Sequence, residues 1–333
     1  MQATAAGQAR GGSHLERRGP GLGGANPVIA ALLGAACISS SAVLVQLAHG
    51  APGTTAFFRC ALALPGLYAL AWGERRRFRP LGRRPVKPRV LAALAGVLLG
   101  VDLVLWTSAI YDVGAGIATV LGNLQVLFVT AIAWFVLRER PRPRFLAALP
   151  VVLLGVALVS GLIGHSSIGH RPLAGTLYGL GTSLAYALFI LVMRTASATP
   201  ALSPMVAGPL ADASAGAALA ALVLGIALGQ LDLTPPLRAL GWYLLLALLS
   251  QTLGWLLITS SLPHLPAAHS SLLLLLQPAA ALVLAAAVLG QRPTLVQLLG
   301  AGLVCGGVLA AARSAGRVRA GGTSRRERAG EKW

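Results

Sequence analysis

The chain has 333 residues, of which 56% are hydrophobic and only 11% are charged, and its formal net charge is +18 at pH 7. Soluble globular proteins carry about 25% charged residues, so this chain has less than half of the usual supply for a hydrated surface. The composition excludes an ordinary soluble domain and predicts a protein whose surface lies largely in lipid.

Apolar runs of about 20 residues, each long enough to cross about 30 Å of hydrocarbon as a helix, follow one another along the chain. The first begins near Pro27 and is too long for a signal peptide, so we expect it to be retained as the first helix. The sequence therefore predicts an all-α membrane protein with ten transmembrane helices. We place them at residues 27–48, 54–72, 90–110, 115–137, 145–163, 173–193, 204–228, 239–260, 266–289 and 295–312.

Positive charges predict the orientation of these helices. Nearly all of the 27 Lys and Arg residues fall in the two tails and in the loops after the second, fourth and sixth helices, whereas Arg171, Arg238 and Arg292 fall in the other loops. Loops rich in Lys and Arg stay cytoplasmic, so both ends are predicted to lie inside a plasma or inner membrane. Because basic segments there meet anionic lipid headgroups, we expect the lipid bilayer, and no nucleic acid, as their partner.

The two halves of the chain resemble each other. A shift of 152 positions, the separation of Gln125 and Gln277, aligns them without a gap from residue 107 to about residue 155. The matched pairs include Leu124-Gln125 with Leu276-Gln277, Arg140-Pro141 with Arg292-Pro293, and Gly155-Val156 with Gly307-Val308. Each half then holds five helices, and because five is odd, the second half enters the membrane inverted. Inverted repeats are typical of transporters that alternate access to a site near the bilayer midplane.

This repeat divides the chain into five segments. Two five-helix repeats occupy residues 27–163 and 173–312, and an external linker spans residues 164–172 between them. We expect a disordered cytoplasmic tail at residues 1–26 and a basic cytoplasmic tail at residues 313–333.

A diffuse set of residues accompanies this architecture. It consists of Arg59 early in the second helix, Glu139 just after the fourth, Gly155-Val156 in the fifth and Pro278 in the ninth. In this pattern the chain resembles the EamA family of the drug/metabolite transporter superfamily. It departs from the family in having Val126 in place of a proline and Gln291 in place of a second acidic residue. The resemblance implies a secondary transporter that exports a small metabolite, such as an amino acid or an amphipathic compound.

Three ionisable side chains fall inside the apolar runs, where an unpaired charge costs several kcal/mol. They are Arg59, Asp102 and Asp212. Asp102 lies about 18 Å into the third helix, near the midplane. It could carry a proton or bind a cationic group, form a structural ion pair with Arg59, or face a wet vestibule without a role. Arg59 could anchor its helix or contact the substrate, and Asp212 occupies a related place in the second half with the opposite charge.

Uncharged side chains complete the predicted substrate site. Gln125 and Gln277 are repeat-related amides in the middle of their helices, and they could bind a substrate or join helices. Trp106, Tyr186 and Trp255 lie deep in their helices, where they could line a cavity for an amphipathic compound or simply pack. With the midplane aspartate, these five residues form the predicted site. Asn123, Gln251 and His269 are weaker candidates of the same kind.

Other motifs constrain the function further. The pairs Gly96-x-x-x-Gly100 and Gly302-x-x-x-Gly306 predict close helix packing, and a homodimer through the fifth and tenth helices is left open. Because no phosphate-binding loop, nucleophile elbow or His-Glu-x-x-His sequence is present, we expect neither an enzyme nor a cofactor or metal site. The alternatives to a transporter are an intramembrane enzyme acting on lipid and a passive channel.

Overall fold

The computed structural model describes residues 26–77, 84–137, 143–159, 171–196, 205–261, 265 and 267–316. Within these ranges all the regular structure is helical, which confirms the all-α part of the predicted fold. The helices are α1 (Pro27–Ser39), α2 (Ser41–Ala48), α3 (Pro52–Ala61), α4 (Leu64–Arg77), α5 (Val86–Val113), α6 (Ala115–Gly122), α7 (Gln125–Leu137), α8 (Pro143–Val159), α9 (Pro172–Ala196), α10 (Ala207–Ala227), α11 (Leu237–Leu245), a π-helical segment (Leu246–Gly254), α12 (Trp255–Ser261), α13 (Ala267–Leu289) and α14 (Leu295–Gly316).

Seven helical stretches in the described chain are long and apolar enough to cross a membrane. They are Pro27–Ala48, Pro52–Arg77, Val86–Val113, Ala115–Ile132, Pro172–Ala196, Ala207–Ala227 and Leu237–Ser261. Three shorter apolar helices, Leu146–Val159, Gln277–Leu289 and Leu295–Ala310, coincide with the remaining predicted spans. The described chain is therefore helical in each of the ten predicted segments, while ten crossings of the membrane stay a prediction.

Four predicted helices are interrupted, which corrects the expectation of continuous spans. The first is interrupted at Ser40, and the second breaks at Leu62, just before Pro65, which has no backbone N–H to donate. The fourth breaks at Asn123, and the eighth passes through the π-helical segment. Hydrophobicity alone predicts that a segment is helical, but not where its hydrogen-bond ladder is interrupted.

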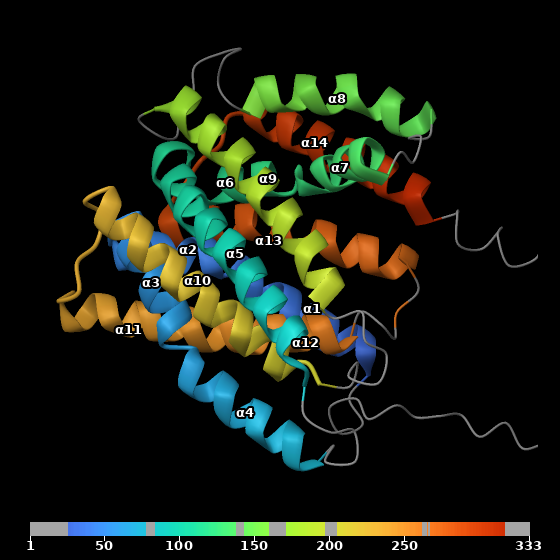
Figure 1. Ribbon diagram of the computed structural model, residues 1–333. Coiled ribbons are helices and arrows are strands. Elements are labelled where there is room, and N and C mark those ends of the chain that lie inside the picture. Colours follow the sequence, from blue (N-terminus) through green and yellow to red (C-terminus); the bar gives the residue numbers. More distant parts are fainter. Residues whose placement is uncertain are drawn as a thin grey trace, which may run out of the picture.

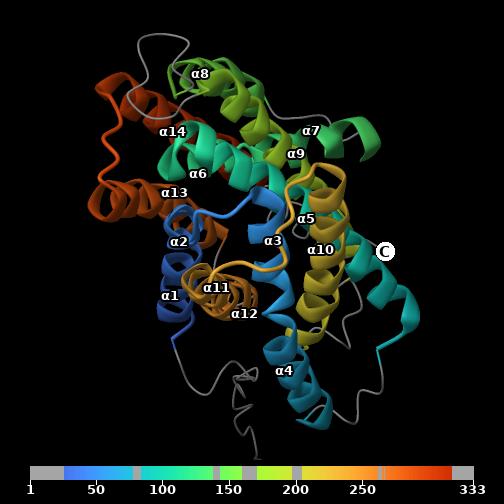
Figure 2. The ribbon, with the colours of Figure 1, turned by 90° about the vertical axis from the view of Figure 1, so that its left-hand side faces the viewer.

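The helix boundaries in the two halves correspond to the internal repeat of the sequence. With the 152-position shift, the start of α6 at Ala115 maps onto the start of α13 at Ala267, and its continuation α7 ends at Leu137, which maps onto the end of α13 at Leu289. The start of α8 maps in the same way onto the start of α14. These related helices also lie together in space, because α8 packs against α14 and α6 packs against α13 (Figures 1 and 2).

Helix α5 lies at the centre of a second group of contacts, where it packs against α9 and α10, while α10 also lies along α3 and α4 (Figure 2). The contact between α5 and α10 depends on glycine, since a Cβ atom on Gly96 would clash with the carbonyl oxygen of Ala213. A Cβ atom on Gly100 would lie 2.6 Å from the carbonyl oxygen of Ala217. The packing prediction is confirmed for this pair but not for Gly302 and Gly306, which have nothing within 4 Å in the described chain.

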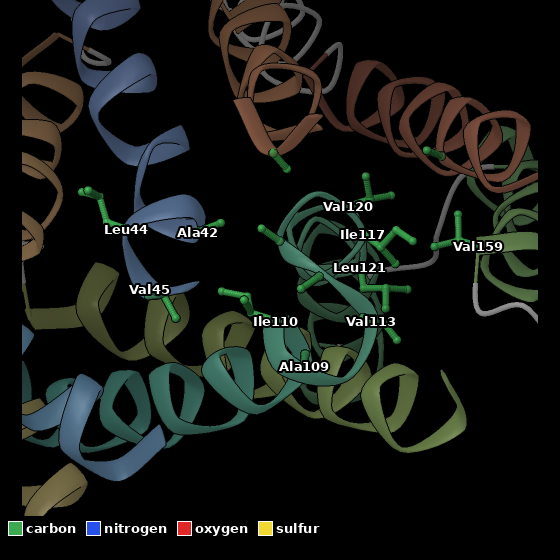
Figure 3. Packing of buried hydrophobic residues seen from close by; sticks show 14 of the residues in the cluster. Ala42, Leu44, Val45, Ala109, Ile110, Val113, Ile117, Val120, Leu121 and Val159 are labelled. Carbon is green, nitrogen blue, oxygen red and sulfur yellow. The ribbon is translucent and has the colours of Figure 1, made fainter. Parts of the chain in front are cut away.

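Apolar side chains divide into an interior set and an outward set. One extended buried cluster joins α2, α5, α6 and α8 (Figure 3), with Val45, Ile110 and Leu121 almost completely inaccessible. Elsewhere, large apolar residues such as Phe135 and Ile226 are exposed. An outward apolar surface is expected of helices whose solvent is lipid, because there the hydrocarbon chains cover it.

Candidate functional site

Arg59 is the most heavily bonded residue in the described interior. It lies near the end of α3, and only 5% of its surface is exposed. Its Nε donates to Oε1 of Gln251 at 3.0 Å, Nη1 donates to the hydroxyl of Ser41 at 2.9 Å, and Nη2 donates to the hydroxyl of Ser250 at 3.0 Å. All three partners are neutral. The guanidinium is thus fixed by hydrogen bonds, but none of them supplies a negative charge.

The π-helical segment is what presents two of these partners. Ser250 and Gln251 are neighbours within it, and both are completely buried. Gln251 also donates from Nε2 to the hydroxyl of Ser214 on α10 at 3.0 Å, so one amide joins α3, the π-helical segment and α10. Single π-helical turns within α-helices recur at functional sites. Gln251, a weaker candidate from sequence, is therefore central to this group.

Asp102 lies on α5, and only 6% of its surface is exposed. The hydroxyl of Thr182 on α9 donates to its backbone carbonyl at 2.8 Å, which fixes α5 against α9 at this point. Trp106, one turn further along α5, lies against the Arg59 guanidinium, so the two charged residues belong to the same region of the interior. Yet among the described ion pairs, none joins them. The structural ion pair considered from sequence is not formed in this conformation.

Aromatic side chains surround the two charges. Trp106 follows Asp102 by one helical turn, and its ring centroid lies 5.7 Å from Cζ of Arg59 in a cation–π arrangement. Tyr186 and Trp255 pack against the same buried cluster as Trp106, and their ring centroids lie 6.1 Å apart. The structure thus brings together four of the six predicted site residues, together with Arg59.

Phe189 completes the aromatic group, and the sequence analysis did not single it out. Its ring centroid lies 5.4 Å from that of Tyr186 and 5.7 Å from that of Trp255. Tyr186 and Trp255 are half-buried, while Phe189 is buried. Phe189 lies three residues after Tyr186 on α9, so helical spacing would have placed the two on one face.

The two predicted amides lie apart from this hydrogen-bond network. Gln125 begins α7 and Gln277 lies within α13, directly before Pro278, and both are half-buried. In the described chain, no hydrogen bond joins either amide to Arg59 or Asp102. Their part in a substrate site stays a prediction.

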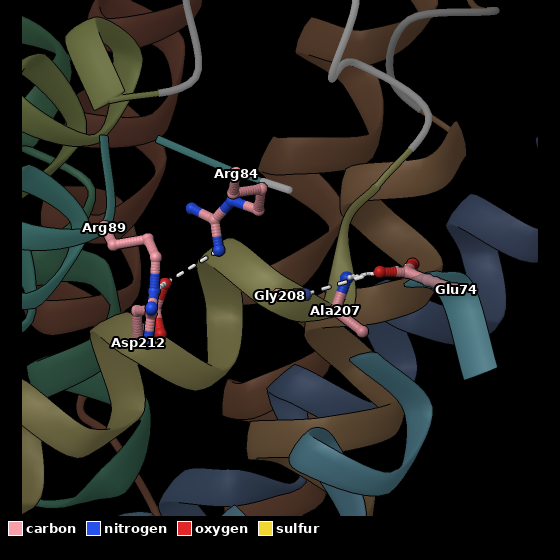
Figure 4. A network of polar contacts seen from close by, with 6 residues as sticks. All are labelled: Glu74, Arg84, Arg89, Ala207, Gly208 and Asp212. Atoms are coloured by element: carbon pink, nitrogen blue, oxygen red, sulfur yellow. Dashed lines mark hydrogen bonds and ion pairs between the residues drawn. The ribbon is translucent and has the colours of Figure 1, made fainter. Parts of the chain in front are cut away.

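Asp212 belongs to a different group of polar contacts (Figure 4), toward the face that the sequence predicts to be cytoplasmic. Its Oδ2 lies 2.7 Å from Nη1 of Arg84, which precedes α5, and 3.8 Å from Nε of Arg89 in the first turn of α5, so the acid is not paired with Arg59. Nearby, Glu74 at the end of α4 accepts hydrogen bonds from the backbone N–H groups of Ala207 and Gly208 at the start of α10. A carboxylate at a helix N-terminus is favourable because the N–H groups there have no intrahelical partner.

Contacts on the opposite, predicted external side join the two halves as well. Oε1 of Gln291 accepts a hydrogen bond from the backbone N–H of Ala115 at 3.2 Å, and Nε2 donates to Oε1 of Gln46. Asp112 pairs with Arg171 at 3.1 Å. Gln291, noted as a departure from the expected acidic residue, is here the residue that holds the start of α6.

Comparison with known proteins decides the family. The profile of the EamA-like transporter family matches residues 26–161 and residues 173–313, so it covers the chain as two consecutive copies. The chain belongs to the EamA-like transporter family. The resemblance inferred from the sequence is therefore confirmed, as is an architecture of two EamA repeats.

Relatives of known sequence and fold agree with this assignment. The chain is 31% identical over 282 residues to the threonine/homoserine exporter RhtA of Escherichia coli K12, an alignment that covers 84% of this chain and 88% of RhtA. It is 28% identical over 225 residues to the uncharacterized transporter YwfM of Bacillus subtilis 168, covering 66% of this chain and 72% of YwfM. A protein of known crystal structure shares the fold, with a TM-score of 0.56, 17% identity, and coverage of 86% of this chain and 97% of that one.

In this EamA protein, sequence reasoning found the charges but missed their partners. Ser41, Ser214 and Ser250 are short neutral residues inside apolar runs, and nothing marks them as more than helix-packing residues. Arg84 was counted only as a loop charge, although only 9% of its surface is exposed. The presence of Glu74 and Asp212 near one predicted membrane face was the available signal that such a loop residue had an acidic partner.

Asn123 and His269 are the two remaining weaker candidates from the sequence. Asn123 donates from its side chain to the carbonyl oxygen of Thr119 one turn earlier, where α6 ends. This local bond suits a helix-terminating role. The side chain of His269 and the whole of Glu139 lie outside the described part of this EamA protein.

Proposed function

We propose that this protein is a secondary active exporter of a small metabolite, such as an amino acid or a similar amphipathic compound. Membership of a transporter family and the 31% identity to a threonine/homoserine exporter support this function. The main structural support for a substrate site here is the pair of buried opposite charges, Arg59 and Asp102, with aromatic side chains beside them. Ionisable residues inside membrane helices mark substrate and ion pathways, because their burial is costly.

The proposed mechanism is alternating access between two inverted repeats of five helices, with residues 27–163 and 173–312 as the repeats. In this mechanism, ten helices cross the membrane and both ends of the chain lie in the cytoplasm. The ion pairs agree with the predicted grouping of residues by membrane face. Asp112 pairs with Arg171, and both are predicted to lie toward one face, while Arg84 pairs with Asp212 toward the other.

Polar contacts on both faces suit such a cycle. Gln291 holds the start of α6 on the external side, while Glu74 holds the start of α10 on the internal side. Each contact joins elements from opposite halves of the chain. We propose that the transporter releases the external contact when it opens outward and the internal contact when it opens inward, since a midplane site can be exposed to only one side at a time.

Asp102 is the proposed coupling residue for protons. A carboxylate at this depth can lose its negative charge by taking up a proton. A proton and a cationic substrate group would therefore compete for the carboxylate. Export of substrate would then alternate with return of a proton through the same side chain. Such exchange needs no nucleotide, which agrees with the lack of a phosphate-binding loop in the sequence.

Transport by the purified full-length protein in proteoliposomes tests this function. We expect saturable uptake of at least one radiolabelled compound from a panel of L-amino acids and amphipathic amines, and acceleration of that uptake by unlabelled compound on the opposite side. W255A should weaken the apparent affinity. The matched control is W72A, because Trp72 is 58% exposed and lies at the end of the second span. Flux that never saturates would instead favour a passive channel.

A further inference from the structure

Arg59 and Asp102 form an unusual combination of buried charges. They carry opposite signs, and Trp106, one helical turn after Asp102 on α5, lies against the Arg59 guanidinium, yet no described ion pair joins the two charges. The partners of Arg59 are two serine hydroxyls and one amide oxygen, all of them neutral. The carboxylate of Asp102 likewise has no cation within ion-pair distance among the described residues. Each buried charge therefore lacks a counter-ion in direct contact, which is costly in a medium of low polarity.

We propose, on the basis of the transport function above, that the substrate is a zwitterion whose carboxylate binds Arg59 and whose ammonium group binds Asp102. Such a molecule neutralises both charges at once. Because it is itself neutral overall, it adds no net charge to the membrane interior. The inference deepens the proposed function by assigning its substrate class to two named side chains.

The guanidinium has the capacity for this role. Arginine carries five N–H donors. In Arg59 one donor on each of the three nitrogens is used, in the hydrogen bonds to Gln251, Ser41 and Ser250. One N–H on each terminal nitrogen is therefore left for a ligand, and a carboxylate is the acceptor that a guanidinium binds best. The three protein bonds fix the orientation of the plane, so little side-chain freedom remains to be lost on binding.

Singly charged compounds fit this arrangement less well. A simple cation would satisfy Asp102 but would also be repelled by Arg59, and a simple anion would meet the reverse situation. The remaining surroundings are apolar and aromatic, with Trp106 against Arg59 and Tyr186 in contact with Trp255. They suit the uncharged side chain of an amino acid, and they also exclude the water that would otherwise screen the two charges.

Three probes that differ at the two charged groups of the substrate test the assignment. They are L-threonine, L-threoninamide, in which the carboxylate is replaced by a neutral amide, and N-acetyl-L-threonine, in which the ammonium is replaced. We would measure their binding to the full-length protein in detergent from the concentration dependence of Tm. Loss of a charge-assisted hydrogen bond should weaken each blocked probe by about 10-fold or more relative to L-threonine.

Two variants separate charge recognition from loss of folding. In D102N the positive charge of Arg59 remains, so N-acetyl-L-threonine should bind better than L-threonine. In R59Q the charge of Asp102 remains, so L-threoninamide should become the preferred probe. A reversal of preference requires a folded site and cannot arise from general destabilisation. D212N is the matched control, because Asp212 is equally buried, at 6% exposed, but is paired with Arg84, and its probe preference should match wild type.

The outcomes distinguish this inference from the function on which it rests. Saturable transport of a singly charged compound, with the zwitterion excluded, would overturn the zwitterion assignment and leave the exporter standing. Equal weakening of all three probes in D102N would also overturn it. Failure of every compound to bind or to be transported would overturn the exporter, and the zwitterion assignment with it.

Discussion

Arg59 and Gln251, which lie 192 positions apart in the sequence, are joined by a buried hydrogen bond of 3.0 Å between Nε and Oε1. The bond links α3 in the first repeat to the π-helical segment in the second. Gln251 extends the link to Ser214 on α10. One amide thus orients the guanidinium and connects the two halves around the proposed site, which makes it the residue most worth changing first.

Replacing Gln251 with leucine should destabilise the protein. Q251L removes the acceptor of Arg59 Nε and the donor to Ser214, and it leaves both groups buried without partners. An unsatisfied buried group costs about 1–3 kcal/mol, and more when it is charged. We expect a clear fall in Tm for the detergent-purified protein, together with weaker substrate binding.

The neighbouring variant T252V is the control for Gln251. The Thr252 hydroxyl donates only within its own helix, to the carbonyl oxygen of Ala247, so its loss disturbs no link between the halves. Its Tm should fall less than that of Q251L. Equal losses in the two variants would mean that the π-helical segment tolerates no substitution, and that the bond to Arg59 has no special importance.

The ion pair between Arg84 and Asp212 should behave as a coupled unit. Arg84 and Asp212 are both buried, and Nη2 of Arg84 has no hydrogen-bond partner among the described residues, so removal of Asp212 would leave a poorly satisfied charge. Breaking a buried pair by removing one partner costs about 3–5 kcal/mol, whereas apolar replacement of both is often far less harmful. R84M and D212L should therefore each lower Tm more than the double variant does. Strictly additive losses across the four proteins would argue against coupling.

Glycines with the same spacing should differ sharply in their tolerance of a methyl group. Gly96 lies against the backbone of α10 at Ala213, whereas Gly302 has nothing within 4 Å in the described chain. G96A must force α5 and α10 apart and should reduce the yield of folded protein, while G302A should fold and melt like wild type. Measurement of both by size-exclusion profile and Tm is decisive. A strong effect of G302A would instead indicate a partner on that face of α14, as a homodimer would supply.

Much of the fold follows from the sequence because lipid imposes a simple rule. A spanning segment must satisfy its own backbone, so an apolar run of sufficient length forms a helix. The breaks depend on other causes, such as Pro65 after α3 or the tertiary bonds of Ser250 and Gln251 in the π-helical segment. Tertiary bonds of this kind are made by residues far apart in sequence, so they cannot be read from a local pattern.

The site was predictable to a similar extent. Asp102 and Trp106 share a helix face by their spacing, and their depth follows from counting along α5. Arg59 was visible as a charge inside an apolar run, but its partners were not, because they converge from α2 and the π-helical segment. Asp212 looked equivalent to Arg59 by repeat symmetry, yet its pairing with Arg84 gives it a different environment.

Labelling of introduced cysteines should establish the orientation. In a background with Cys37 and Cys305 replaced by alanine, Cys60 is buried and should stay unlabelled. We expect a membrane-impermeant maleimide to label R238C in intact cells and K87C only after lysis, since both native residues are exposed and lie on opposite predicted faces. The reverse pattern would invert the topology, and with it the proposed direction of export.

Asp102 should determine the response of transport to pH. If the carboxylate carries a proton in the return step, an imposed proton gradient drives substrate against its own gradient in the wild-type protein. Asparagine cannot take up that proton, so D102N should lose the acceleration by the gradient, and any residual flux should be the same with and without it. D212N should keep the acceleration, because Asp212 is held by Arg84 outside the proposed site. Uptake into proteoliposomes with and without a pH step measures the acceleration. Full transport by D102N with unchanged pH dependence would show that Asp102 takes no part in proton coupling.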